Sequence, residues 1–329
     1  MQKSFWLCVA VIVWIVLAAL PIWGQGVTAD PLIGALAYSQ FDSLAPNQVW
    51  LLIDQAEYWA IPRDPPPNYY ASVQTSSASA LRSILHDLID EHKNYKYSTI
   101  DTPEEEGFEV DTWDIIALAD AHPDSSHYVL DLYLNGTFQR QDKGVMFTRH
   151  YDREHTWPKS LGFNSESSPA YTDCHHLFAA YSSYNSSRGN KPYGTSTLSQ
   201  GLCKPTEANL ERGGPSFCNF RFAKVWEVWE GRRGDVARAM FYMAIRYEGD
   251  AQDEPDLELT DDLSRIRTSS AWRTQGEAFM GLLPVLLEWH QEDPVDDLER
   301  RRNSIVYLFQ KNRNPFVDHP EWVEDMFGG

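Results

Sequence analysis

The feature that most constrains this chain is the stretch from His150 to Asn190, where side chains that bind metals or transfer protons are concentrated. It contains four histidines and four carboxylates, together with asparagine and arginine side chains. Packing alone rarely requires so many groups of this kind in one short segment. The stretch therefore predicts a functional site, and the rest of the chain is interpreted as its scaffold.

Residues 1–29 are predicted to be a signal peptide. Lys3 supplies a positive start, Phe5–Leu20 is an apolar run of suitable length, and Val27–Ala29 offers small residues for cleavage. An uncleaved membrane anchor is the alternative, because the run is close to the shortest spanning helix. No basic flank follows it, which favours cleavage. We therefore expect a secreted or periplasmic protein that keeps no membrane attachment.

Residues 30–67 are interpreted as a leader or linker. They end in the proline-rich run Pro62–Pro67, which should be extended and semi-rigid. The main domain is accordingly predicted over residues 68–329, a length that can bury a large core. We expect it to be a monomer.

Export changes how the cysteines are interpreted. Cys203 and Cys218 bracket a short loop rich in glycine and proline, and they are the natural disulfide pair in an oxidising compartment. Cys174 adjoins His175 and His176, so a metal thiolate is conceivable, but a small buried core residue is the favoured role.

The formal net charge of −19 argues at first against a nucleic-acid partner. The acidity is unevenly distributed, however: residues 30–149 carry 7 basic and 19 acidic side chains, and residues 247–329 carry 8 and 19. Residues 150–203 carry 4 of each, and residues 204–246 carry 8 basic and 5 acidic. A less acidic face on an acidic body is compatible with phosphate binding that depends strongly on salt. Solubility outside the cell explains the acidity equally well.

Four helices are predicted from apolar residues that recur at helical spacing. The first begins at Ser77 or Ser79, and the others span Gly234–Tyr247, Gln275–His290 and Val295–Gln310. Pro284 is expected to kink the third helix, and Arg300–Arg302 to form a solvated face of the last. Between them, residues 250–262 are predicted to be an acidic loop.

Two strands are predicted before the site. Val129–Leu134 alternates in polarity and is followed by the turn signal Asn135-Gly136, and Val145–Phe147 leads into the motif stretch. Because consecutive strand residues face opposite sides, Glu154 and His155 can share one site only if the backbone leaves regular β geometry there. The whole pattern predicts a helix-rich α+β single domain with a small β element carrying the site.

Hydrolysis of a phosphodiester requires an activated water, stabilisation of the charge on the transition state, and help for the departing oxygen. A neutral histidine suits the first role, and a divalent cation held by oxygen ligands suits the other two. Glu154 and His155 supply one candidate for each role, and Asn185 adds a neutral carbonyl ligand. This donor set favours Mg²⁺ with a partly open coordination shell.

Several motifs, in order along the chain, resemble those of the bacterial endonuclease I family. They are REHTWPKSLG, DCHHLFAAYSSYNSSRGNKPYG, GDVARAMFYMAIRYE, LLEWHQEDPVDDLERRRN and NRNPFVDHPE. The resemblance runs from about Asn68 to about Glu321. It implies a periplasmic or secreted nuclease with a ββα-metal (His-Me) finger. Its products would carry 5′-phosphates.

By this resemblance, His155 is the general base, Glu154 the metal ligand on the β side, and Asn185 the metal ligand on the helix. An N-cap is the alternative role for Asn185. The chain departs from the family at Asp152, Cys174 and Phe178, where Asn, Leu and Arg are usual. The last change puts a phosphate contact in doubt.

Other residues of the stretch are assigned lesser roles. Arg188 is the favoured phosphate clamp because a guanidinium can grip two phosphate oxygens, although a surface ion pair is the alternative. Arg153 and Asn190 are weaker candidates for phosphate binding. His175 and His176 are expected to support the site or to pack beneath it, and Trp157 to lie in the core.

Together these features predict an exported, sequence-nonspecific endonuclease that acts on DNA, with RNA as a further candidate substrate. Sequence-independent action follows if the enzyme contacts backbone phosphates rather than base edges. Mg²⁺ is the expected cofactor, with Ca²⁺ or Mn²⁺ as substitutes. A zinc hydrolase that uses the histidine cluster is one alternative. A catalytically inactive, secreted nucleic-acid-binding module of the same fold is the other.

Overall fold

The computed structural model describes residues 38–55, 60–74, 77–99, 105, 107–144, 149–195, 225–251, 254–266 and 277–328. The predicted signal peptide, the strand Val145–Phe147 and the Cys203–Cys218 pair lie outside these residues. In the described ranges, no helix combines the length and apolar character needed to cross a bilayer.

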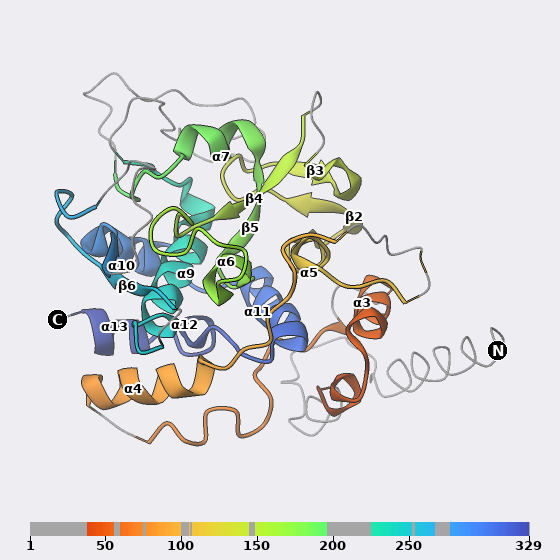
Figure 1. Ribbon diagram of the computed structural model, residues 1–329, viewed down its shortest axis with the longest axis horizontal. Helices are drawn as coiled ribbons and strands as arrows, with labels where there is room; N and C mark the ends of the chain where they lie inside the picture. The colour runs from red at the N-terminus through yellow and green to blue at the C-terminus, as the bar shows by residue number, and fades with distance from the viewer. Residues whose placement is uncertain are drawn as a thin grey trace, which may run out of the picture.

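The fold is an α+β single domain, as predicted, and several of its helices pack around α9 (Figure 1). Helix α9, Arg233–Arg246, is buried on nearly all sides and packs against α4, Ala78–Ile89, and α10, Leu283–Glu292. Ser77 caps α4 by accepting a hydrogen bond from the backbone of Ala80. The periodic helices predicted at both places are confirmed.

A second core lies between α3, Pro46–Gln55, α5, Thr112–Ala119, and α11, Asp297–Gln310. Its apolar residues include Tyr38, Trp50 and Ile61, which belong to the segment interpreted as a leader. Trp50 Nε1 also donates to the backbone oxygen of Asp114 at 3.3 Å. The described part of residues 30–67 is thus packed into the domain, and residue 68 marks no break in the packing.

A three-stranded antiparallel sheet contains β1, Ala121–His122, β2, Ser125–Leu130, and β3, Thr137–Gln139. The predicted strand ends earlier than expected, at Leu130. Asp131 ends it because its carboxylate accepts hydrogen bonds from the backbone amides of Tyr133 and Leu134. The turn at Asn135-Gly136 is confirmed, and Leu130 pairs with Thr137 across it.

Two predictions for the C-terminal third are wrong. A parallel two-stranded sheet, β6, Asp256–Leu259, with β7, Glu277–Met280, replaces part of the predicted acidic loop and the first turns of the predicted helix. Pro284 lies in the first turn of α10 instead of kinking a longer helix. The first turn tolerates proline, since its amides have no partner within the helix.

Arg301 and Arg302 do not form a solvated face. They are 4 % and 6 % exposed on α11, and Arg302 Nε donates to Asp120 Oδ1 at 2.8 Å. The same guanidinium donates to the backbone oxygens of Cys174, at 3.0 Å, and Leu177. Through Arg302, helix α11 therefore holds the backbone of residues 174–177 in place.

The remaining short elements connect these layers. They are η2 Arg140–Asp142, β4 Tyr151–His155, α6 Pro169–Thr172, β5 Leu177–Tyr181, α7 Ser182–Arg188, η4 Glu230–Arg232, α12 Pro315–Asp318 and α13 Trp322–Phe327. Strands β4 and β5 run beside each other near the centre of Figure 1, with α7 directly beyond them.

Candidate active site

Glu154 and His155 are the last two residues of β4, which pairs antiparallel with β5. Glu154 lies opposite Phe178 and His155 opposite Leu177, so the ladder continues through both. The prediction that the backbone leaves regular β geometry here is wrong. Consecutive strand residues face opposite sides, and the two side chains accordingly have different neighbours.

His155 is held in one tautomer by the backbone. Its Nε2 lies 3.0 Å from the carbonyl oxygen of Tyr171, and a carbonyl can only accept, so Nε2 carries the proton. The ring is 6 % exposed and packs against Tyr171 and His176. Burial, with the nearby His176, lowers the pKa of His155 well below its usual range. The neutral ring therefore presents Nδ1 as its basic nitrogen.

Glu154 is anchored through one carboxylate oxygen. Its Oε1 accepts from the Tyr133 hydroxyl and from Arg188 Nη1, both at 2.8 Å, and the hydroxyl of Tyr193 contacts that of Tyr133 at 2.7 Å. Among the described residues, none donates to Oε2. Burial raises the pKa of Glu154 to about 7, against the opposing effect of the Arg188 charge.

Asn185 lies in the second turn of α7, the helix that follows β5 directly. Helix α7 begins at Ser182 with Tyr181 before it, so the N-cap alternative for Asn185 is wrong. Its Nδ2 donates to the backbone oxygen of Arg153 at 3.4 Å, next to Glu154 in the chain. This contact leaves the Asn185 carbonyl oxygen as the acceptor end of the side chain.

Arg188 is 1 % exposed, and its guanidinium is engaged by the protein. Besides Glu154, it donates to the backbone oxygens of His155 at 2.8 Å, Thr156 at 2.6 Å and Lys191 at 3.1 Å. The guanidinium thus ties the end of β4 to the end of α7. This geometry gives no support to a phosphate clamp, and that role stays a prediction.

Arg153 is also buried, between two aromatic rings. Its Cζ lies 3.3 Å from the ring centre of Tyr97 and 4.1 Å from that of Trp113, and it donates to Thr112 Oγ1 at 2.7 Å. Asn190 is half-buried just beyond α7. The hydrogen bonds of the Glu154 and His155 side chains are made with other residues. Phosphate binding by these two residues stays a prediction.

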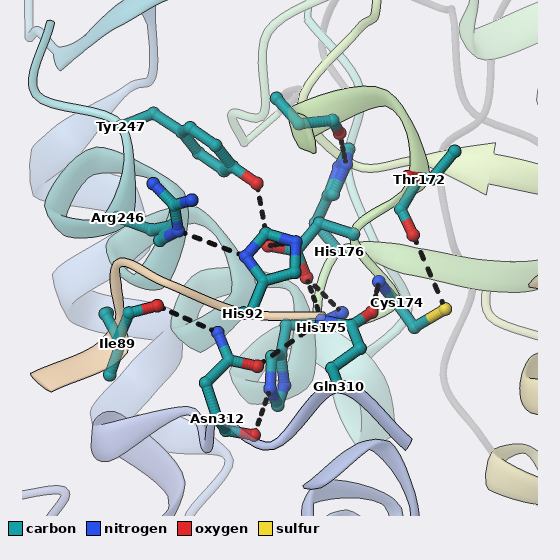
Figure 2. Close-up of polar contacts among 12 residues, drawn as sticks. Ile89, His92, Thr172, Cys174, His175, His176, Arg246, Tyr247, Gln310 and Asn312 are labelled. Carbon is teal, nitrogen blue, oxygen red and sulfur yellow. Dashed lines mark hydrogen bonds and ion pairs between the residues drawn. The ribbon is translucent and has the colours of Figure 1, made fainter. Parts of the chain in front are cut away.

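Just before β5 in the chain, the carboxylate of Asp173 is fully buried and joins a polar network, of which Figure 2 labels His92, His175 and Gln310. Its Oδ2 accepts from the hydroxyls of Tyr242 at 2.7 Å and Tyr247 at 2.9 Å. Its Oδ1 accepts from the His175 amide at 2.9 Å and Gln310 Nε2 at 3.0 Å. The sequence did not single out Asp173, although its position directly before Cys174 and two histidines was a usable signal.

The two adjacent histidines contribute to this structure in different ways. His175 Nε2 lies 3.1 Å from the backbone oxygen of Asn312, and its ring packs on Tyr242. His176 Nε2 lies 2.7 Å from the backbone oxygen of Ala170, and its ring centre is 5.4 Å from that of His155. Cys174 is fully buried, as predicted, and so is Trp157.

We expect acid to destabilise the fold through these histidines. Burial lowers the pKa values of His175 and His176 from 6.5 to about 4, so between those values the unfolded chain binds more protons than the folded chain. Stability should therefore fall from pH 6.5 to pH 4, by on the order of 3 kcal/mol per histidine. Urea unfolding at pH 7 and pH 4 measures the loss in the free energy of unfolding. In His175→Gln this free energy should depend less on pH. An unchanged unfolding midpoint would contradict the expectation.

The oxygen donors on β4 and α7 fit a hard divalent cation. Glu154 and Asn185 are each fixed through one polar atom, which leaves a carboxylate oxygen and an amide oxygen as potential ligands. A different group, formed by His86, Asp90 and Asp250, places its ligand atoms within 4.8 Å of one another. It lies at the ends of α4 and α9, where Arg246 Nη1 already contacts Asp90 at 2.7 Å.

The chain was compared with known proteins. The model of the endonuclease I family matches residues 81–321. An extracellular ribonuclease of Bacillus subtilis (strain 168) is 35% identical over 264 residues, 79% of this chain and 78% of the relative. An extracellular ribonuclease of Bacillus amyloliquefaciens is 35% identical over 265 residues, with the same coverage. No solved structure matches significantly.

Proposed function

Because this chain belongs to the endonuclease I family, and is therefore a nuclease, we propose that His155 is its general base and that Glu154 and Asn185 hold a catalytic Mg²⁺. The observation that carries the proposal is the contact between His155 Nε2 and the Tyr171 carbonyl oxygen, at 3.0 Å. It fixes the proton on Nε2 and leaves Nδ1 as a base, in a ring that burial keeps neutral.

In this mechanism Nδ1 of His155 takes a proton from the attacking water. The cation would stabilise charge on the phosphate and on the departing 3′ oxygen. Arg188 and Tyr133 hold Glu154 by its Oε1 and so direct the other oxygen. Glu154 and His155 end strand β4 on opposite faces, so this mechanism requires the phosphate to lie across the strand end, where adjacent Cα atoms are about 3.8 Å apart.

We propose that the substrates are RNA and DNA, cut without sequence preference to give 5′-phosphate ends. The relatives are named extracellular ribonucleases, which supports RNA as one substrate and secretion as the destination of this chain. Contacts to the phosphate backbone of the nucleic acid, rather than to base edges, would explain cleavage without sequence preference.

The test is digestion of plasmid and RNA with Mg²⁺, Ca²⁺, Mn²⁺, Zn²⁺ or EDTA, followed by end-group analysis. EDTA should abolish cleavage and Mg²⁺ should restore it. Glu154→Gln should raise the Mg²⁺ concentration needed for half-maximal rate by at least about tenfold, because even outer-shell partners typically contribute about 10–100-fold.

Glu109→Gln is the matched control, since this glutamate is exposed and pairs with Lys96 at 2.6 Å. It should keep the metal dependence of the wild type. Zinc bound in the purified protein, with no rescue by Mg²⁺, would instead support a zinc hydrolase. Equal metal dependence of Glu154→Gln and wild type would remove Glu154 from the cation site.

A further inference from the structure

A strip of cationic and aromatic side chains leads away from His155, with Tyr171 and Arg153 buried and Lys159, Tyr97, Trp113 and Lys143 exposed or half-buried. Lys159 Nζ lies 4.7 Å from the ring centre of Tyr171, the residue that anchors His155, and 5.6 Å from that of Tyr97. Arg153 lies between Tyr97 and Trp113. Further along, Lys143 Nζ lies 6.0 Å from the ring centre of Trp113.

The strip ends at a cavity of about 530 Å³ between α5 and the β2–β3 hairpin. This volume is within the range of small-molecule sites. Its walls combine aromatic, amide and cationic side chains, among them Trp50, Tyr128, Gln139, Arg140, Gln141 and Lys143. Tyr128 is 41% exposed, which is unusual for an aromatic side chain among the residues that the structure describes.

The charges in the cavity are largely balanced within it. Arg140 pairs with Asp54, and Lys143 Nζ lies 3.7 Å from Asp114 Oδ1. A ligand here would therefore meet planar rings and neutral hydrogen-bonding groups rather than a net charge. A nucleobase has these complementary properties, with two π faces and a polar edge.

The cavity and His155 lie near opposite ends of strand β4. The hydroxyl of Tyr151, at the start of β4, donates to the backbone oxygen of Arg140 at 2.7 Å, whereas His155 ends the same strand. Four residues of strand advance roughly 13 Å, or about four nucleotides at a stacked spacing of about 3.4 Å.

We propose that this strip binds one strand of the nucleic-acid substrate, with a phosphate near Lys159 and a base in the cavity that Tyr128 and Lys143 line. The proposal rests on the function proposed above, because it makes the strip an extension of the His155 site. Aromatic faces can take up bases only when those bases are unpaired. The strip therefore selects single-stranded segments over duplex.

The test compares single-stranded oligonucleotides of two to eight nucleotides as substrates. In the wild type, kcat/KM should rise with length, mainly through a lower KM. In the double variant Lys143→Ala, Tyr128→Ala, the ratio of kcat/KM for the octamer to that for the dimer should fall by about 5- to 100-fold, the range for one lost stacked base.

Lys311→Ala is the matched control, because the Lys311 side chain is 41% exposed and that of Lys143 is 39%. It should retain the wild-type ratio. The proposal is overturned if the double variant keeps that ratio, if the wild type shows no length dependence, or if Lys311→Ala lowers the ratio equally.

Fluorescence anisotropy in EDTA separates binding from catalysis. A labelled single-stranded octamer should bind the double variant at least about fivefold more weakly than the wild type, whereas duplex binding should change little. An equal loss of affinity for duplex in the double variant would overturn the proposed selection for single strands. Wild-type binding without cleavage in any metal would refute the proposed function while supporting the strip.

Discussion

Replacing His155 with alanine should lower kcat by roughly 10²–10⁴-fold, the usual contribution of a general base. The fold should persist, because the side chain makes one hydrogen bond, to the Tyr171 carbonyl, and the strand pairing at this residue is made by the backbone. Initial rates on RNA and plasmid at saturating Mg²⁺ measure the loss. Circular dichroism and the melting temperature check the fold.

Added imidazole should restore part of the activity of His155→Ala, since it replaces the missing base without repairing any structural defect. His122→Ala is the control, because that ring is partly exposed on β1 and belongs to neither the proposed base nor the cation site. Wild-type rates in His155→Ala would show that a different group activates the water.

Replacing Asp173 with alanine should produce the largest loss of stability, at least about 3 kcal/mol. It would leave Tyr242, Tyr247 and Gln310 without the acceptor that they now share, and buried groups without partners are costly. Burial alone would raise the pKa of Asp173, but the neighbouring imidazoles, including His92 and His175, and the donated hydrogen bonds hold it well below its usual value.

Urea unfolding at pH 7 measures this loss as a lower midpoint. Asp124→Ala is the control, because its side chain is 89% exposed, and such surface changes usually stay within about 0.5 kcal/mol. A loss below about 1 kcal/mol in Asp173→Ala would mean that neighbouring groups or water replace the carboxylate.

The sequence predicted the elements whose signals are local. Helices α4 and α9 have a continuous apolar periodicity, and the turn at Asn135-Gly136 has residues that suit positive φ, as Asn135 shows at 49°. The adjacent Glu154 and His155 were chosen from motif chemistry, and the structure places both at the end of one strand. Local information was sufficient for these features.

Features that depend on distant partners were not predicted. Arg302 has a charged side chain that favours solvent, yet Asp120, from a distant part of the chain, pairs with it in the interior. Strand β7 is short, and among the described residues its pairing partner is β6, a segment that is not adjacent to it in sequence. The residues of β7 alone therefore did not indicate a strand. Tyr133, which donates to Glu154, and Tyr193, whose hydroxyl contacts that of Tyr133, lie on opposite sides of Glu154 in the sequence.

The network around Asp173 also has a consequence for the timing of synthesis. The carboxylate lies just before β5, yet one of its hydrogen bonds comes from Gln310, and Asn312 contacts the same cluster. A nascent chain that has exposed the whole histidine stretch, but not yet these residues, lacks part of the hydrogen bonding around Asp173, just before strand β5. The support for the proposed site is therefore complete only after Gln310 and Asn312 have been synthesised, well after the histidine stretch.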